Sequence, residues 1–403
     1  MNDIAFLPSP VHLPGANIKV VGVGGAGCNA LNRMIESGVS GVQFIAMNTD
    51  QQSLAQCRAS IKISLGPVTM RGLGAGGDPD RGERAAEESR DEIIASLNGA
   101  DMVFITAGMG GGTGTGAAPV IASCANYAEA LAVAVVITPF LWEGSGKMQK
   151  ANEGVGKLRD VADSVIVVSN EKLKDYCHHD IKTKDAYGAA DGVLIQGVKG
   201  ITDLILRPGI INGDFADVKA VLCNSREALI GTGQGRGDDP LKEGVRKALE
   251  CPLLERDQQG SATKVIVSVM ADWDKIPLSA VEEAMKFLRD HYKGQPDIKL
   301  CQAEAPELED RVLVTILASG FDGHFIEGVL PGRIAEPPEP LTHTAAQTVR
   351  IPGDQSYTVE PTRIIGMGIQ PPPTPSGEME AVSELQIPTI VRIQQGQLPM
   401  PME

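Results

Sequence analysis

The amino-acid sequence predicts an α/β protein that consists of a doubly wound parallel sheet, one long helix and a smaller mixed α/β domain. Three observations carry this prediction. Short apolar, strand-like segments alternate with helical segments in the first half of the chain. Glycine-rich loops directly follow several of these segments, and one long helical pattern separates the first half from further strand-like segments. Such alternation is typical of a parallel sheet that helices cover on both faces.

The first half supplies the expected parallel sheet. Buried strands are expected where the apolar runs occur, at residues 18–23, 42–47, 102–106, 132–137 and 164–168, with helices at 30–37 and 84–97. In open sheets of this type, ligands bind at the carboxyl ends of the strands. The glycine loops described below all fall at those ends.

A long helix is expected at residues 185–206, followed by the second domain. Four apolar residues recur at helical spacing within this helix, and Arg207-Pro208-Gly209 ends the pattern: Leu194, Val198, Ile201 and Ile205. Strands at 264–270 and 311–318, with a helix at 279–289 between them, predict a smaller mixed α/β domain.

The chain after residue 322 differs in composition from the rest. It holds half of the chain's 26 prolines and has no long periodic apolar pattern, which predicts a disordered linker. An apolar island at 384–392 indicates a docking peptide, with a chance cluster as the alternative. The expected order is a flexible extension at 1–17, the sheet domain at 18–183, the central helix at 184–208, the smaller domain at 209–322, the linker at 323–383 and a partner-binding tail at 384–403.

Composition and charge exclude several classes of protein. A net charge of −15 argues against nucleic acid or an anionic membrane as a direct ligand. The seven cysteines are scattered without a C-x-x-C pair, which favours reduced thiols in a cytoplasm over a disulfide framework. Residues 1–14 lack the pattern of a signal peptide, and the longest apolar run, at 131–142, is too short to span a bilayer. We therefore expect a soluble cytoplasmic protein without direct membrane insertion.

The most informative motif is the run of small residues from Gly108 to Gly116. It follows a predicted strand and precedes a helix-like run, so it places glycine backbone N–H groups and a helix N-terminus at one point. This arrangement is typical of an anion cradle for phosphates, to which Thr113 and Thr115 add hydroxyl groups. It is not a P-loop, because no Gly-Lys-Ser/Thr sequence closes it.

Two further glycine loops lie at residues 22–29, directly after a predicted strand, and at residues 72–78. Residues 22–29 match G-x-G-x-x-G, and Asp50 lies roughly where a ribose-binding acid belongs, so a nicotinamide-dependent oxidoreductase is an alternative. A nicotinamide enzyme does not need a second phosphate cradle at 108–116. The third loop, at 72–78, suits a terminal phosphate. The histidines also form no evident hydride-transfer site.

Polar residues at the ends of later strands suit a sugar and a base. Glu143 is placed to reach the sugar, and Asn170 ends the next strand. Tyr187 and Asp191, at the start of the long helix, suit a guanine: the carboxylate pairs with two N–H donors that adenine lacks, and Tyr187 supplies a stacking face.

An acidic motif, Asn212-Gly213-Asp214-Phe215-Ala216-Asp217, follows the long helix. Two carboxylates three residues apart lie on one helical face and can orient a water or hold a cation for phosphoryl transfer. The alternative is a helix N-cap, which the spacing fits equally well. Cys177-His178-His179-Asp180 suggests a metal site less strongly than a solvated loop, because adjacent side chains rarely converge on one ion.

Together these motifs resemble those of FtsZ, the family of prokaryotic tubulin-like division proteins. The resemblance covers about residues 18–322 and the tail peptide. It rests on the signature loop at 110–116, on Gly72-Leu73-Gly74-Ala75-Gly76, and on Asn212-x-Asp214-Phe215-Ala216-Asp217.

The resemblance implies a tubulin/FtsZ-like fold and a GTPase that polymerises head to tail into the cell-division ring. GTP or GDP, with Mg²⁺, would bind the domain at 18–183. The acidic motif at 212–217, called the acidic loop below, would complete the active site of the next subunit at the γ-phosphate. The implied catalytic residues are Asn212, Asp214 and Asp217. The implied phosphate-binding residues are Gly24, Gly25, Gly27, Ala75, Gly76, Gly108, Gly110, Gly111, Gly112, Thr113, Gly114, Thr115 and Gly116. The remaining implied nucleotide contacts are Asn29, Glu143, Lys147, Asn170, Tyr187 and Asp191.

The resemblance also implies partners, and the sequence departs from the family in places. The tail would bind a membrane-tethering division protein such as FtsA at the cytoplasmic division site, although Ile390 stands where an aromatic residue is common. Lys147 stands where arginine is common, and 177–184 is more polar than usual. A tubulin-like scaffold that binds GTP without hydrolysing it is the alternative within this fold.

Overall fold

The computed structural model of the chain describes residues 15–174, 182–207, 209–211, 213–251, 262–292 and 295–321. These residues all belong to one compact unit. Several expectations lie outside them: those for residues 1–14, the segment at 177–180, Asn212, the linker and the tail.

A parallel sheet forms the first half, as predicted. Its strand order is β3-β2-β1-β4-β5-β6, and every neighbouring pair is parallel. The strand bounds are β1 (Ile18–Val23), β2 (Val42–Asn48), β3 (Ile61–Ser64), β4 (Met102–Gly108), β5 (Leu131–Thr138) and β6 (Ser164–Ser169). Most of their residues are buried, which explains why these strands read as continuous apolar runs.

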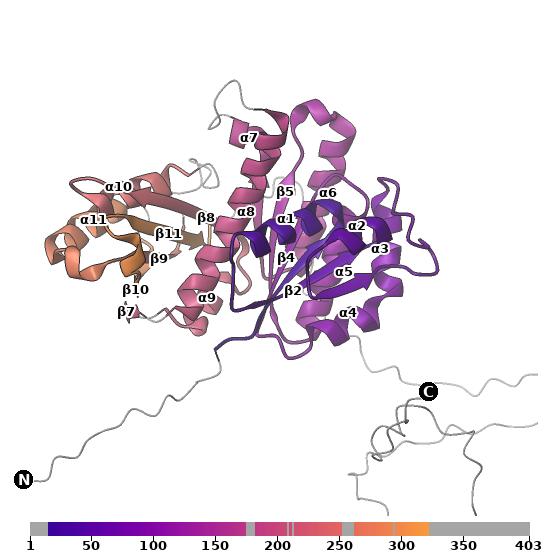
Figure 1. Ribbon diagram of the computed structural model, residues 1–403, viewed down its shortest axis with the longest axis horizontal. Helices are drawn as coiled ribbons and strands as arrows, with labels where there is room; N and C mark the ends of the chain where they lie inside the picture. The colour runs from indigo at the N-terminus through magenta and orange to yellow at the C-terminus, as the bar shows by residue number, and fades with distance from the viewer. Residues whose placement is uncertain are drawn as a thin grey trace, which may run out of the picture. The chain divides into compact units, whose positions relative to one another are not determined.

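Helices cover both faces of this sheet (Figure 1). Alternate strand residues enter two separate cores: Val20 packs into one and Val21 into the other. The first core includes residues of α1 (Gly24–Glu36), α2 (Gln51–Gln56) and α8 (Thr183–Leu206). The second includes residues of α3 (Pro79–Glu88), α4 (Arg90–Leu97), α5 (Thr113–Tyr127) and α6 (Ser145–Val161). The doubly wound prediction is confirmed.

The single helix expected at 84–97 is wrong, because two helices, α3 and α4, meet at Ser89. Ser89 is 5% exposed, and its hydroxyl accepts the backbone N–H of Gly66 at 3.0 Å. A serine whose side chain serves another segment is a weak helix-interior residue. The helical pattern therefore continues through Ser89 while the helix itself does not.

The second part of the chain adds a mixed sheet. Its elements are β7 (Gly209–Ile211), α9 (Phe215–Leu222), β8 (Arg226–Gly235), α10 (Pro240–Leu249), β9 (Lys264–Ala271), α11 (Leu278–His291), β10 (Asp297–Glu304) and β11 (Val312–Ser319). β9 and β10 are parallel, whereas β11 is antiparallel to both β8 and β9. β8 also pairs in parallel with β6, so the strands of both parts form one hydrogen-bonded order. The long helix α8 runs between the two parts (Figure 1).

Candidate nucleotide site

Two helices that begin in glycine loops leave their first N–H groups available. Neither α1 nor α5 has a side-chain cap, and neither has an acidic residue in its first turn. By contrast, α2, α3, α9 and α10 each begin at an aspartate whose carboxylate accepts backbone N–H groups. Uncapped N–H donors and the positive end of the helix dipole favour an anion at the start of α1 and α5.

The glycines of these loops serve two purposes. Most allow close packing between loops: a Cβ on Gly108 would lie 2.6 Å from the Cβ of Ala26, and one on Gly110 would lie 2.8 Å from the carbonyl oxygen of Lys147. Gly24, Gly27, Gly112, Gly114 and Gly116 are crowded in the same way. Gly25 and Gly111 instead face open space, because a Cβ added to either would have no atom within 4 Å. The surface available to a phosphate is therefore at Gly25 and Gly111.

The two threonines of the signature loop have different positions. Thr113 is half-buried, and its hydroxyl lies 2.6 Å from that of Thr49. Thr115 is 2% exposed, and its hydroxyl accepts the N–H of Gly110 at 2.9 Å. The side chain of Thr115 therefore shapes the loop, whereas sequence reasoning treated it as a donor to phosphate.

The third loop packs against the first. Ala75 is buried, with its Cβ beside Gly112, while Gly76 is exposed. Gly74 donates its N–H to the carbonyl of Thr49 at 3.1 Å, and Lys150 donates to the carbonyl of Gly77 at 2.7 Å. These contacts hold the 72–78 loop beside the start of α5.

A cavity of about 230 Å³ adjoins the glycine loops. It brings together six of the predicted nucleotide contacts, which come from α1, the loops after β4 and β5, and the starts of α7 (Asn170–Lys174) and α8: Asn29, Gly108, Glu143, Asn170, Tyr187 and Asp191. The side-chain oxygen of Asn170 is buried and has no hydrogen-bond partner among the described residues. An unsatisfied buried oxygen is costly, so it marks a place where a ligand can donate a hydrogen bond.

Arg33 is a cavity residue that sequence reasoning missed. Its Nε lies 3.1 Å from Oδ2 of Asp191, whose side chain is 12% exposed. Burial raises the pKa of Asp191, and the positive charge of Arg33 opposes that rise. No local sequence signal indicates the pair, because Arg33 lies on α1 and Asp191 on α8.

Glu143 organises the rim of the cavity. It accepts the backbone N–H of Phe140 at 3.0 Å and pairs with Lys147 at 3.1 Å. Tyr187 packs edge-on against Phe140, with ring centroids 5.4 Å apart. Burial raises the pKa of the Tyr187 hydroxyl, and the charge of Glu143 raises it further. Lys147 is exposed and does not line the cavity itself. It contacts the cavity residue Glu143 through their ion pair.

The acidic motif forms a helix cap. Oδ1 of Asp214 accepts the N–H of Asp217 at 2.8 Å, and the N–H of Asp214 donates to Oδ2 of Asp217 at 3.0 Å. This reciprocal capping box starts α9, which confirms the N-cap alternative as a structural role of both acids. Neither acid lines the cavity that holds Asp191.

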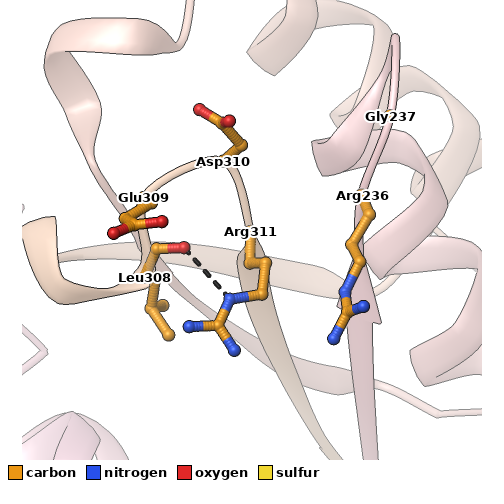
Figure 2. Close-up of a pocket in the computed structure, with 6 residues that line it drawn as sticks. All are labelled: Arg236, Gly237, Leu308, Glu309, Asp310 and Arg311. Atoms are coloured by element: carbon orange, nitrogen blue, oxygen red, sulfur yellow. Dashed lines mark hydrogen bonds between the residues drawn. The ribbon is translucent and has the colours of Figure 1, made fainter.

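A second cavity, of about 380 Å³, lies in the C-terminal part of the chain (Figure 2). Figure 2 shows Arg236 and Arg311 in its wall. Glu309 and Asp310 lie on the turn that connects Leu308 to Arg311. Together with the adjoining cavity of about 590 Å³, it has three basic side chains, including Lys275, and six acidic ones: Asp238, Asp239, Asp272, Glu283, Glu309 and Asp310. This excess of acids disfavours a polyanionic nucleotide.

Three other observations concern residues that the structure describes. Asp50 caps α2 by accepting the N–H groups of Gln52 and Ser53, so its carboxylate has a structural role that does not depend on a nucleotide. Within the described ranges, no three His, Cys, Asp or Glu side chains cluster as a metal site would need. No described helix has the length and apolar character to cross a bilayer.

Comparisons with known proteins agree with this geometry. Residues 17–178 match the GTPase domain of the tubulin/FtsZ family, and residues 226–322 match the C-terminal domain of the FtsZ family. An FtsZ dimer from M. jannaschii, described as empty, is 42% identical, with a TM-score of 0.70 over 76% of this chain and 88% of that chain. A mutant of FtsZ from the same organism gives the same identity and TM-score, over 76% of this chain and 92% of that one.

The chain belongs to the FtsZ family.

CetZ2 from Haloferax volcanii, described as a GTPγS-bound protofilament, shares the fold at 22% identity, with a TM-score of 0.64 over 76% of this chain and 94% of that chain. Membership in the FtsZ family confirms both the family resemblance and the fold class that were predicted from the sequence. It also establishes a tubulin-like GTPase domain, for which GTP and GDP are the nucleotides. The nicotinamide alternative is not supported.

Proposed function

We propose that this FtsZ-family chain hydrolyses GTP at junctions between copies that join head to tail into filaments. One observation carries the proposal: the nucleotide cavity and the acidic loop lie at opposite ends of α8. Asp191 lines the cavity, and α8 continues to Leu206 before the acidic loop begins. These fifteen residues span about 22 Å at a rise of 1.5 Å per residue. The acids therefore serve the nucleotide of a neighbouring copy.

The nucleotide is proposed to bind as follows. The N-termini of α1 and α5 hold the phosphates at Gly25 and Gly111, and the exposed Gly76 borders them. Glu143 contacts the sugar, with Lys147 as its partner. Asn29, Asn170 and Asp191 contact guanine beside Tyr187. The buried oxygen of Asn170, which lacks a hydrogen-bond partner in the described part of the chain, and the carboxylate of Asp191 can accept hydrogen bonds, which suits the N–H groups of guanine.

Exposed apolar side chains lie beside the nucleotide site and beside the acidic loop, and both groups support contact between copies. Leu73, Leu141 and Trp142 lie on the loops around the nucleotide site and are 79%, 63% and 63% exposed. Beside the acidic loop, Ile210 and Ile211 are 65% and 44% exposed. Two different surfaces that complement each other give a heterologous contact, and such a contact builds an open filament when it does not close a ring.

Asp214 and Asp217 are proposed to orient the attacking water at the γ-phosphate of the neighbouring copy, and Asn212 of the same sequence motif is proposed to share this role. Loss of the γ-phosphate would then weaken the junction. Mg²⁺ fits this site as an ion that arrives with the nucleotide: it needs few protein ligands besides phosphate oxygens and water, and the half-buried Thr113 at the start of α5 offers a hydroxyl oxygen. When bound, it would neutralise phosphate charge.

The cellular role follows from this assembly. We propose that the filaments form the division ring in the cytoplasm and that the tail at 384–403 binds a membrane-tethering protein such as FtsA. Deletion of 384–403 should leave GTP-dependent sedimentation unchanged and abolish cosedimentation with that partner. A truncated chain that no longer pellets with GTP would contradict this division of roles.

Phosphate release measured across protein concentrations tests the main proposal. Specific activity should rise above a critical concentration, at which GTP-dependent pelleting and filaments in electron micrographs begin. A flat specific activity would overturn assembly-dependent hydrolysis. Filaments without phosphate release would favour the non-hydrolysing scaffold, and NAD extracted from the purified protein would refute GTP binding.

A further inference from the structure

The acidic loop has a basic partner that comes from a distant strand. Lys299, on β10, forms an ion pair with Oδ2 of Asp217 through its Nζ. The same oxygen accepts the N–H of Asp214 at 3.0 Å. A Cβ on Gly213 would lie 2.7 Å from Sγ of Cys301, so the backbone of the acidic loop also packs closely against β10. One strand therefore fixes both the backbone and one carboxylate of the acidic loop.

Lys299 also compensates for the proximity of two carboxylates. Asp214 and Asp217 are joined by the capping box, and two adjacent negative charges disfavour each other. The ammonium group of Lys299 and the hydrogen bonds from Asp214 lower the pKa of Asp217 against the opposing effect of burial. The titratable groups near Asp217 are Asp214 from its own loop, and Lys299 and the neutral Cys301 thiol from β10. Asp217 is thereby held as an anion, and Asp214 is the more exposed acid.

We propose that Lys299 is a positioning residue for hydrolysis in trans: it holds the Asp217 carboxylate and, through the capping box, presents Asp214 to the nucleotide of the neighbouring copy. This inference rests on the proposed function. Lys299 reaches the substrate only through Asp217 and is not itself catalytic.

A purely structural role for Lys299 predicts little. Its side chain is 43% exposed, and exposed ion pairs contribute weakly to folding stability. The N-cap bond from Asp217 N to Asp214 does not involve Lys299, so α9 keeps its cap without the lysine. A large effect of Lys299 on turnover would therefore reflect the geometry of the acids.

Lys299→Met and Lys299→Arg in the full chain test this inference, with Lys275→Met as the matched control. Lys275, in the 3-10 turn at Trp273–Lys275 after β9, forms comparable exposed ion pairs with Asp272 and Asp310. Phosphate release per pelleted subunit gives kcat, and GTP binding and the critical concentration are measured alongside.

Lys299→Met should lower kcat about tenfold or more, because misplaced catalytic groups lose rate while binding persists. GTP affinity and GTP-dependent pelleting should stay near wild type. Lys299→Arg should restore most of kcat, and Lys275→Met should leave it unchanged. A wild-type kcat in Lys299→Met, or no rescue by arginine, would overturn the inference. Failure of the proposed function would show instead in the wild-type chain, as activity independent of concentration.

Discussion

At the scale of single residues, Asp191 is a buried carboxylate that lines the proposed nucleotide cavity. Burial disfavours the charged carboxylate, and the ion pair with Arg33 partly offsets that penalty. Because the pKa of Asp191 is raised in the folded chain, its contribution to stability declines as pH rises from the unfolded pKa through the folded one. Hydrogen bonds from guanine would offset the remaining penalty.

Arg33→Met should enlarge this effect. Without its partner, the pKa of Asp191 rises further, and the nucleotide-free protein should lose about 1 kcal/mol near neutral pH, a small value because Arg33 is 37% exposed. The loss should vanish below about pH 4, because the folded carboxylate, with its raised pKa, is then protonated with or without Arg33. Thermal unfolding across pH measures this, with Arg58→Met as the control because Arg58 forms an exposed pair with Glu36. A loss of stability that is equal at all pH values would contradict the account.

Cys28, in the first helix, should be chemically silent. It is 1% exposed, and burial, with a smaller contribution from Cys57, raises the pKa of its thiol to about 12. The thiolate is the reactive form, so alkylation of the native chain near pH 8 should be slow. Peptide mapping after iodoacetamide treatment checks this, with the partly exposed Cys223 as the internal reference. Equal labelling of the two cysteines would show that the 22–29 loop opens.

At the scale of elements, neighbouring glycines of the signature loop should respond differently to alanine. Gly110 has a φ of +93°, and a Cβ there would lie 2.8 Å from the carbonyl oxygen of Lys147. Gly110→Ala should destabilise the fold by about 1–3 kcal/mol. Gly111 faces open space, so Gly111→Ala should fold normally and bind GTP more weakly. Thermal denaturation and nucleotide binding separate the two outcomes, and equal unfolding of both variants would mean that Gly111 serves packing.

Local signals explain which elements could be predicted from the sequence. The apolar parallel strands and glycine loops carry their own patterns, and the structure reproduces them. β8 is not among the strands predicted from the sequence, and Gly231, Gly233 and Gly235 interrupt its apolar strand pattern. Those glycines are needed where α10 crosses the strand: a Cβ on Gly233 would collide with the carbonyl of Gly244. The pairs Arg33–Asp191 and Lys299–Asp217 join distant elements, so only the folded topology reveals them.

At the scale of the whole molecule, α8 lies between the proposed nucleotide cavity and the acidic loop of the same chain. The strand pairing of β6 with β8 and the packing of α8 against β5 and β8 join the two parts of the fold. A nucleotide site at one end and an acidic loop at the other therefore cannot meet within one copy. In the proposed filament, each chain would therefore contribute one half to each of two active sites.

Complementation between two inactive variants tests this arrangement directly. Asp214→Ala should bind GTP and fail to hydrolyse it, whereas Asp191→Ala should bind GTP weakly while keeping its acidic loop intact. In an equal mixture, the nucleotide end of the first variant meets the acidic loop of the second at up to about a quarter of the junctions, if heterologous contacts form at random. Phosphate release should then exceed the sum of the separate activities and approach that fraction of wild type. Because no single chain in the mixture holds both functional ends, activity that stays at the sum would mean that hydrolysis requires both sites in the same copy, and the shared junction would have to be abandoned.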